Sequence, residues 1–265
     1  MRKKLKEKIL LITMFFLAVS SFLGALPSKA ANEDNTHKNR ITVYLAGDST
    51  VSNYEDSLAP RAGWGQVFDR FFDDKIVVKN EAPSGRSSKS FIDEGRLDSI
   101  LNQIEKGDYL FIQFGHNDEK VEDPTRYTEP HSTYKSYLKQ YIDGARVKGA
   151  TPVLVTPVER RRFTEEGIAR DSHGEYPVAM KELGLEENVP VIDLTAKSKA
   201  LFQELGPEGT KDLFLFLDAG EHVNYPNGVQ DNTHFQEAGA EAIARLVLEG
   251  IEESHLVPVR NHIIK

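Results

Sequence analysis

The sequence predicts an α/β fold in which a parallel five-stranded sheet lies between two layers of helices, a three-layer α/β/α sandwich. Segments with strand character alternate along the chain with segments of helical periodicity. The strand segments are continuous apolar runs, which is typical of parallel strands buried on both faces of a sheet. No internal repeat and no linker rich in Pro, Gly or Ser divides residues 41–265, so we expect them to form one domain.

Five segments have the composition of buried strands. In chain order they are 41–46, 76–78, 109–114, 152–155 and 189–192. The first and third combine apolar, β-branched and aromatic residues and stop at Gly47 and Gly115, which predicts a turn at each of these ends. The other three are shorter runs rich in Val and Ile, which favour strands.

Six segments repeat their apolar residues at helical spacing. They are 63–72, 96–105, 133–148, 176–187, 196–204 and 237–253. In 96–105, for example, Leu97, Ile100, Leu101 and Ile104 fall on one face of a helix. We therefore expect each of these segments to pack one apolar face against the sheet.

Four polar segments fall where the predicted strands end. They read GDST at 47–50, SGRS at 84–87, GHND at 115–118 and DNTH at 231–234, the last one just before the final helix. In open parallel sheets the ligand site lies beyond the carboxyl ends of the strands. The shared position of these segments predicts a functional site there.

The residue types in these turns suit acyl transfer. The hydroxyl of Ser49 needs a base, and an imidazole such as that of His234 is the usual one. Asp231 stands three residues earlier, where a carboxylate can accept the second N–H of the ring. The N–H groups of Ser49 and Gly85 and the side-chain amide of Asn117 are candidate donors to an oxyanion. Each segment alone is also typical of an ordinary turn or helix cap.

The four segments occur in the order of the four blocks of the SGNH (GDSL-type) hydrolases. Longer segments resemble the rhamnogalacturonan acetylesterases: 47–51, 63–65, 85–91, 115–118, 156–163, 192–194 and 231–235. The resemblance extends from about residue 41 to 253 and implies a flavodoxin-like SGNH hydrolase fold and a catalytic domain over 41–265. Ser84 departs from it, because relatives often carry a second small residue such as glycine there.

The resemblance also implies roles and a reaction. Ser49 is the implied nucleophile, and Asp231 and His234 complete a triad with it. Gly85 and Asn117 are the implied oxyanion donors besides Ser49. The implied reaction removes acetyl groups from galacturonic acid residues of pectic rhamnogalacturonan, with no metal or organic cofactor.

Composition excludes several other classes of function. The chain has no cysteine, which rules out disulfides, thiol nucleophiles and thiolate metal sites. Its formal net charge of −8 argues against a nucleic-acid partner, since such binders need a basic surface. The sequence lacks a Gly-x-Ser-x-Gly elbow, a Walker loop and a metal-binding motif, which argues against an α/β-hydrolase, phosphate chemistry and a metal site.

We expect a monomer that acts on an acetylated pectic polysaccharide or oligosaccharide.

A uronate substrate needs cationic contacts. Arg86 and the run Arg160–Arg162 are the candidates, with Arg160 the one chosen from the run, because arginine binds carboxylates through two hydrogen bonds. His222, near the segment that holds the triad histidine, is a further candidate contact. The loop-rich stretches 119–132, 163–175 and 218–230 are expected at the rim of the cleft. Trp64 suits either sugar stacking or core packing.

The first thirty residues have the three-part pattern of a secretory signal peptide. A basic start precedes an apolar run from Ile9 to Leu26, and small residues then precede a cut after Ala30. Residues 1–30 hold six basic residues and one acidic residue, so residues 31–265 hold 27 basic and 40 acidic ones, a net charge of −13. We expect cleavage, a flexible lead-in over 31–40 and an extracellular protein without a stable membrane partner, the alternative being an uncleaved anchor.

Three other functions remain open on the sequence. An acetylesterase of another glycan such as xylan would use the same residues. A lipid acyl-esterase would need an apolar channel, and no long apolar loop lies near the four segments. A non-catalytic glycan-binding protein would have no need for a nucleophile, a base and a complete set of oxyanion donors.

Overall fold

The central sheet has five parallel strands in the order β3-β1-β4-β5-β6. The computed structural model describes residues 40–264, so the expected signal peptide and residues 31–39 of the lead-in lie outside the described residues. The strands are β1 (Ile41–Gly47), β3 (Ile76–Asn80), β4 (Tyr109–Gln113), β5 (Thr151–Val155) and β6 (Val191–Ile192). The expected parallel sheet is therefore confirmed, and β6 begins two residues later than expected.

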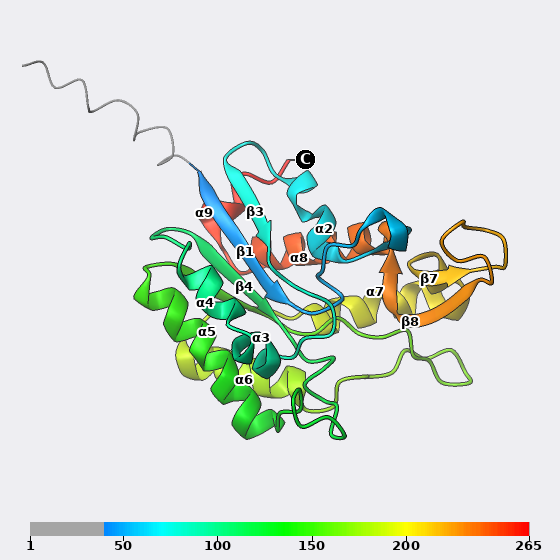
Figure 1. Ribbon diagram of the computed structural model, residues 1–265, viewed down its shortest axis with the longest axis horizontal. Coiled ribbons are helices and arrows are strands. Elements are labelled where there is room, and N and C mark those ends of the chain that lie inside the picture. Colours follow the sequence, from blue (N-terminus) through cyan, green and yellow to red (C-terminus); the bar gives the residue numbers. More distant parts are fainter. Residues whose placement is uncertain (1–39, 265) are drawn as a thin grey trace, which may run out of the picture. The chain divides into compact units, whose positions relative to one another are not determined.

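Helices cover both faces of this sheet (Figure 1). One layer holds α3 (Ser88–Asp93), α4 (Arg96–Leu101), α5 (Lys135–Val147) and α6 (Tyr176–Glu187). The other holds α2 (Trp64–Val67), α7 (Leu194–Gly209), α8 (Glu237–Glu253) and α9 (Val257–Arg260). The three-layer α/β/α sandwich is confirmed.

Alternate side chains of each central strand enter opposite cores. In β1, Val43 and Leu45 pack toward α2 and α8, whereas Tyr44 and Ala46 pack toward α5. All four side chains are at most 2% exposed. Burying a large apolar side chain contributes about 1.5–3 kcal/mol, so a strand that is apolar at every position stabilises both layers.

A second, antiparallel sheet lies beside the first and is absent from the sequence-based expectation. Its strand order is β2-β8-β7, with β2 (Arg61–Ala62), β7 (Phe214–Leu217) and β8 (Val229–Gln236). The sequence of β8, VQDNTHFQ, is mostly polar because the strand is only partly buried and carries site residues. Polarity of this kind hides a strand from a search for apolar runs.

Several helical expectations differ from the structure. Helix α4 ends at Leu101 and not at residue 105, and α7 extends beyond the expected 196–204 at both ends. The segment expected as one helix over 63–72 is a single α-helical turn, α2, followed by a 3₁₀ turn at Phe68–Phe71. Helix α3 was not expected. It begins with a capping box, in which the side chains of Ser87 and Ser90 accept hydrogen bonds from each other's backbone N–H groups.

Within residues 40–264 no helix is long and apolar enough to cross a membrane.

Gly63 is a position where backbone segments come unusually close. A Cβ added there lies 2.4 Å from the carbonyl oxygen of Ser52 and 2.5 Å from the carbonyl carbon of Val51. The N–H of Trp64 also donates to the carbonyl of Thr50, at 2.9 Å. Gly63 therefore lets α2 pack directly against the turn that follows β1.

We expect Gly63→Ala to lower the free energy of unfolding by about 2 kcal/mol, because the added methyl group overpacks against backbone. For a domain of this size that corresponds to a loss of roughly 4–8 °C in Tm, measured by thermal unfolding. Gly209→Ala is the matched control: its backbone is helical (φ −65) and the nearest atom to its added Cβ is 3.4 Å away. Equal Tm values for the two variants would contradict this account of Gly63.

Candidate active site

A cavity of about 350 Å³ at the ends of β1 and β4 brings the predicted turns together. Its lining consists of Ser49, Arg61, Ser84, Gly85, His116, Asn117, Lys120, Arg126, Arg160, Thr233 and His234. All four polar segments expected at the sheet edge contribute to it. A larger cavity of about 530 Å³ between α6 and α7 contains none of the predicted triad or oxyanion residues.

Ser49, His234 and Asp231 form one hydrogen-bonded chain. The Nε2 atom of His234 lies 3.0 Å from the Oγ atom of Ser49. On the other side of the ring, Nδ1 lies 2.6 Å from Oδ2 of Asp231. The structure therefore brings together the three residues of the predicted triad in the order that acyl transfer needs.

A bulge in β8 gives His234 its position. Neighbouring residues of β7, Phe214 and Leu215, pair with Phe235 and Asp231 of β8, so residues 232–234 lie unpaired between them. The second carboxylate oxygen of Asp231 accepts the backbone N–H groups of Thr233 (2.8 Å) and His234 (3.0 Å). Bulges commonly re-aim a side chain beside an active site. Asp231 both shapes this bulge and orients the imidazole.

Asp231 stays ionised far into acid. Partial burial raises its pKa, but the hydrogen bond and charge of His234 and the two backbone N–H donors outweigh burial and hold the pKa at about 2. Its negative charge is therefore present throughout the pH range in which most proteins are folded.

A chain of buried hydrogen bonds holds the turn that carries Ser49. The indole N–H of Trp64 donates to Gln113 (2.8 Å), and the amide of Gln113 donates to the hydroxyl of Thr50 (2.7 Å). Thr50 in turn donates to Asp48 through its hydroxyl (2.8 Å) and its backbone N–H (2.9 Å). Trp64 is 1% exposed, so it packs in the core and does not face a substrate.

The two other predicted oxyanion donors share one anchor. Asn117 donates one amide N–H to the carbonyl of Arg86 (3.0 Å), and an amide carries two such donors. Arg126 donates to the amide oxygen of Asn117 (3.3 Å) and to the carbonyl of Gly85 (3.5 Å). Asp123 holds the same guanidinium at 2.6 Å. Arg126, which the sequence did not single out, thus connects Gly85 and Asn117.

Asp118 ties the same two loops together from inside the protein. Its carboxylate accepts the backbone N–H of Ser88 (3.1 Å), the hydroxyl of Ser88 (2.5 Å) and the hydroxyl of Thr128 (3.0 Å). Burial raises the pKa of Asp118 to about 7 despite these donors. The start of α3 and the turn after β4 are therefore fixed relative to each other.

The family of the chain follows from comparison with known proteins. The model of the GDSL-like Lipase/Acylhydrolase family matches residues 43–247. The chain belongs to this family. It is therefore an ester hydrolase of the SGNH/GDSL type, and the expected family is confirmed.

Individual relatives cover most of this GDSL-like hydrolase. It is 52% identical to rhamnogalacturonan acetylesterase RhgT of Bacillus subtilis, over 86% of this chain and 96% of that protein. It is 48% identical to probable rhamnogalacturonan acetylesterase YesY of the same organism, over 84% of this chain and 97% of that one. The crystal structure of protein YxiM from Bacillus subtilis matches with a TM-score of 0.70 and 32% identity, over 82% of this chain and 58% of that one.

The predicted substrate contacts of this GDSL-like hydrolase lie in different places. Arg160 lines the cavity, but its guanidinium pairs with Glu119 and donates to the carbonyls of Ser172 and His116. Arg86 does not line the cavity. Its side chain pairs with Glu94 and donates to the carbonyl of Ser84.

His222 also lies outside the cavity lining, with its Nδ1 accepting the N–H of Asn224 at 3.1 Å.

The sequence missed three cationic lining residues: Arg61, Lys120 and Arg126. Lys120 and Arg126 fall in the stretch 119–132 that was expected at the rim. Among residues 40–264, no group of three or more His, Asp or Glu side chains is arranged to hold a metal ion.

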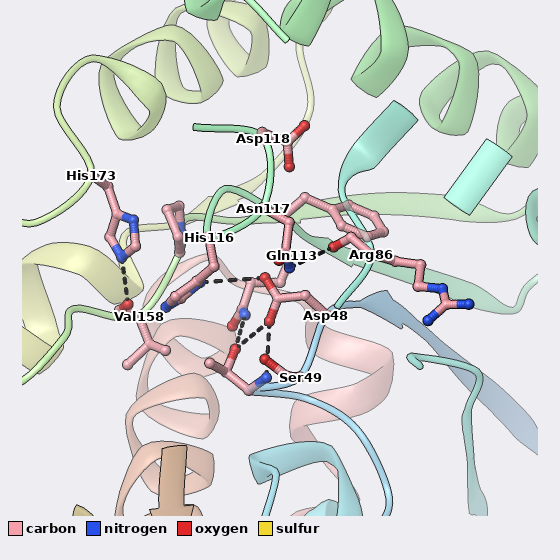
Figure 2. A network of polar contacts seen from close by, with 12 residues as sticks. Asp48, Ser49, Arg86, Gln113, His116, Asn117, Asp118, Val158 and His173 are labelled. Carbon is pink, nitrogen blue, oxygen red and sulfur yellow. Dashed lines mark hydrogen bonds and ion pairs between the residues drawn. The ribbon is translucent and has the colours of Figure 1, made fainter. Parts of the chain in front are cut away.

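His116 belongs to a buried network behind the serine (Figure 2). Its Nδ1 lies 3.3 Å from Asp48, and its ring lies 4.4 Å from that of His173. His173 in turn contacts the carbonyl of Val158 (2.8 Å) and Glu119 (3.2 Å). Burial lowers the pKa of His116 to about 4 although the charge of Asp48 acts to raise it. His116 is thus a neutral ring at ordinary pH.

This neutral histidine predicts a pH dependence of stability. An unfolded histidine has a pKa near 6.5, so between about pH 6.5 and 4 the unfolded chain binds a proton that folded His116 does not. The free energy of unfolding must therefore fall as the pH falls, with a contribution of about 3 kcal/mol from this residue. We expect His116→Asn to show a smaller loss than wild type between pH 7 and 4.5, measured by urea unfolding.

His131→Asn is the control. His131 is exposed, and hydrogen bonds to Glu182 and Glu175 raise its pKa, so removing it acts on the pH dependence in the opposite direction. The same loss of stability in wild type and His116→Asn would contradict the assignment of a buried neutral ring.

Proposed function

We propose that this GDSL-like hydrolase removes acetyl groups from rhamnogalacturonan through an acetyl-enzyme on Ser49. The hydrogen-bonded chain of Ser49, His234 and Asp231 at a cavity carries the mechanistic part of the proposal. The names of RhgT and YesY, at 52% and 48% identity, support the choice of polymer.

In the first half of the proposed reaction, Ser49 Oγ attacks the acetyl carbonyl carbon while Nε2 of His234 takes the hydroxyl proton. The carbonyl oxygen becomes negatively charged. It accepts hydrogen bonds from the backbone N–H groups of Ser49 and Gly85 and from the side-chain amide of Asn117. The C–O bond to the sugar then breaks, and the sugar oxygen takes the proton from His234. The carboxylate of Asp231 stabilises the imidazolium between these steps.

In the second half, water replaces the sugar. His234 takes a proton from the water as its oxygen attacks the carbonyl carbon of acetyl-Ser49, through the same oxyanion contacts. The bond to Ser49 Oγ breaks, Ser49 regains its proton from the imidazolium, and acetate leaves. No step needs a group beyond this chain's own residues and water.

The lining of the cavity favours a polar substrate over a lipid. Every residue of the lining is charged, polar or glycine, and none has an aliphatic or aromatic hydrocarbon side chain. A long acyl chain would need hydrocarbon side chains around it to leave water. A short acetyl group on a hydroxylated sugar needs no such surroundings.

We further propose that the enzyme acts outside the cell as a monomer. The extracellular location is supported by the signal-peptide pattern over residues 1–30, with its basic start, its apolar run and the small residues that end at Ala30. A chain without cysteine folds in an oxidising compartment without disulfide formation.

The test is acetate release from acetylated rhamnogalacturonan, acetylated xylan and p-nitrophenyl acetate by wild type and Ser49→Ala. We expect release from the pectic polymer well above xylan, and a drop of several orders of magnitude in kcat for the variant, because the nucleophile is gone. Ser136→Ala, exposed on α5 and outside the cavity lining, is the matched serine control and should keep its activity.

Near-normal turnover by Ser49→Ala would contradict the mechanism. If acetate release depends on Ser49 but is faster from acetylated xylan than from rhamnogalacturonan, the mechanism stands and rhamnogalacturonan is rejected as the substrate. Absence of release from all three substrates would favour a glycan-binding protein.

A further inference from the structure

The cavity carries a charge opposite to that of the chain. The full sequence has a formal net charge of −8, yet the lining contains Arg61, Lys120, Arg126 and Arg160 and no Asp or Glu. Cationic side chains concentrated in a concave site raise the local concentration of anions. The lining is therefore built for a negatively charged ligand.

Two of the four cations are already neutralised by the protein. Arg126 pairs with Asp123 at 2.6 Å, and Arg160 pairs with Glu119. Each of these guanidinium groups also donates to backbone or side-chain oxygens around the site. They shape the cavity walls and have little capacity left for a ligand.

Arg61 and Lys120 differ in this respect. Within residues 40–264, no carboxylate lies within 4.0 Å of either cationic group, although ion pairs are common elsewhere on the chain. The Nε atom of Arg61 is buried and has no hydrogen-bond partner. A buried N–H donor without a partner costs free energy, so the protein itself does not fully satisfy this guanidinium.

The backbone and an aromatic ring hold Arg61 beside the triad. In strand β2, Arg61 pairs with Gln236 and Ala62 pairs with Phe235, two and one residues after the triad histidine in β8. The guanidinium lies 4.4 Å from the ring centre of Tyr54, whose hydroxyl donates to the carbonyl of Ser49 at 2.7 Å. The guanidinium is thus held over the Tyr54 ring without an acidic partner, and a planar anion is the ligand that its N–H groups suit.

We propose that Arg61 and Lys120 form a carboxylate subsite next to Ser49, which selects sugars that carry a uronate beside the ester. The inference rests on the proposed function in that the ester is cut at Ser49. Arginine binds a carboxylate through two parallel hydrogen bonds, and lysine adds a point charge. The subsite thus replaces Arg86 and Arg160 as the uronate contact.

The experiment measures inhibition of p-nitrophenyl acetate hydrolysis by digalacturonate, with neutral galactobiose as the matched disaccharide. We expect wild type to bind digalacturonate at least tenfold more tightly than galactobiose, with a preference that declines as salt is added. Arg61→Met and Lys120→Met should each raise the Ki for digalacturonate about tenfold and leave the Ki for galactobiose within twofold. Each Ki is measured against the variant's own uninhibited rate.

Arg245→Met is the matched control. Arg245 is exposed on α8, and its guanidinium also lies 4.8 Å from an aromatic ring centre, that of Phe71, outside the cavity lining. This variant should keep the wild-type Ki. Arg61→Lys, which keeps the charge, should recover part of the affinity that Arg61→Met loses and thereby separate binding from a folding defect.

Two results would overturn the subsite. One is a wild-type enzyme that binds digalacturonate no better than galactobiose. The other is an unchanged Ki for digalacturonate in both Met variants. Failure of the proposed function would appear separately, as the lack of acetate release from acetylated rhamnogalacturonan, because the inhibition assay uses only the small neutral ester.

Discussion

The hydrogen-bonded chain from Asp231 through His234 to Ser49 is the interaction on which the site depends. Ser49 and His234 are 185 positions apart in sequence, and their side chains meet only because two different sheets meet. Ser49 follows a strand of the parallel sheet, whereas Asp231 and His234 belong to the antiparallel one. The bulge at 232–234 then turns the imidazole toward the serine.

The other half of the site depends on polar contacts between loops. Arg126 joins the loop of Gly85 to the side chain of Asn117, and Asp118 joins the same region to the start of α3. These contacts fix the candidate oxyanion donors before any substrate binds. Donors that are already in place need no rearrangement when charge develops, and electrostatic stabilisation of this kind is a large part of catalysis.

Much of the fold and the location of the candidate site could be predicted from the sequence, because strands buried on both faces leave long apolar runs. Polar turns at the ends of such runs mark the edge where ligands bind. The second sheet could not be predicted in this way. Its longest strand, Val229–Gln236, is half-exposed and polar, so it leaves no apolar signal.

The charged contacts were the least predictable part. Arg160 has the residue type expected of a uronate contact, but Glu119, distant in sequence, takes up its charge. Arg61 carries no local signal, since its position comes from pairing with β8. Which cation remains available to a ligand is decided by long-range partners, and a single sequence does not reveal them.

The most direct test of the account is labelling with a fluorophosphonate, a reagent whose phosphorus bonds to an activated serine oxygen as fluoride leaves. We expect one label per chain, found on Ser49 by peptide mass spectrometry, and a labelling rate at least about 10³-fold lower in His234→Ala, because no base then takes the hydroxyl proton. A label on another serine, or equally fast labelling of Ser49 in His234→Ala, would contradict the claim that His234 activates Ser49.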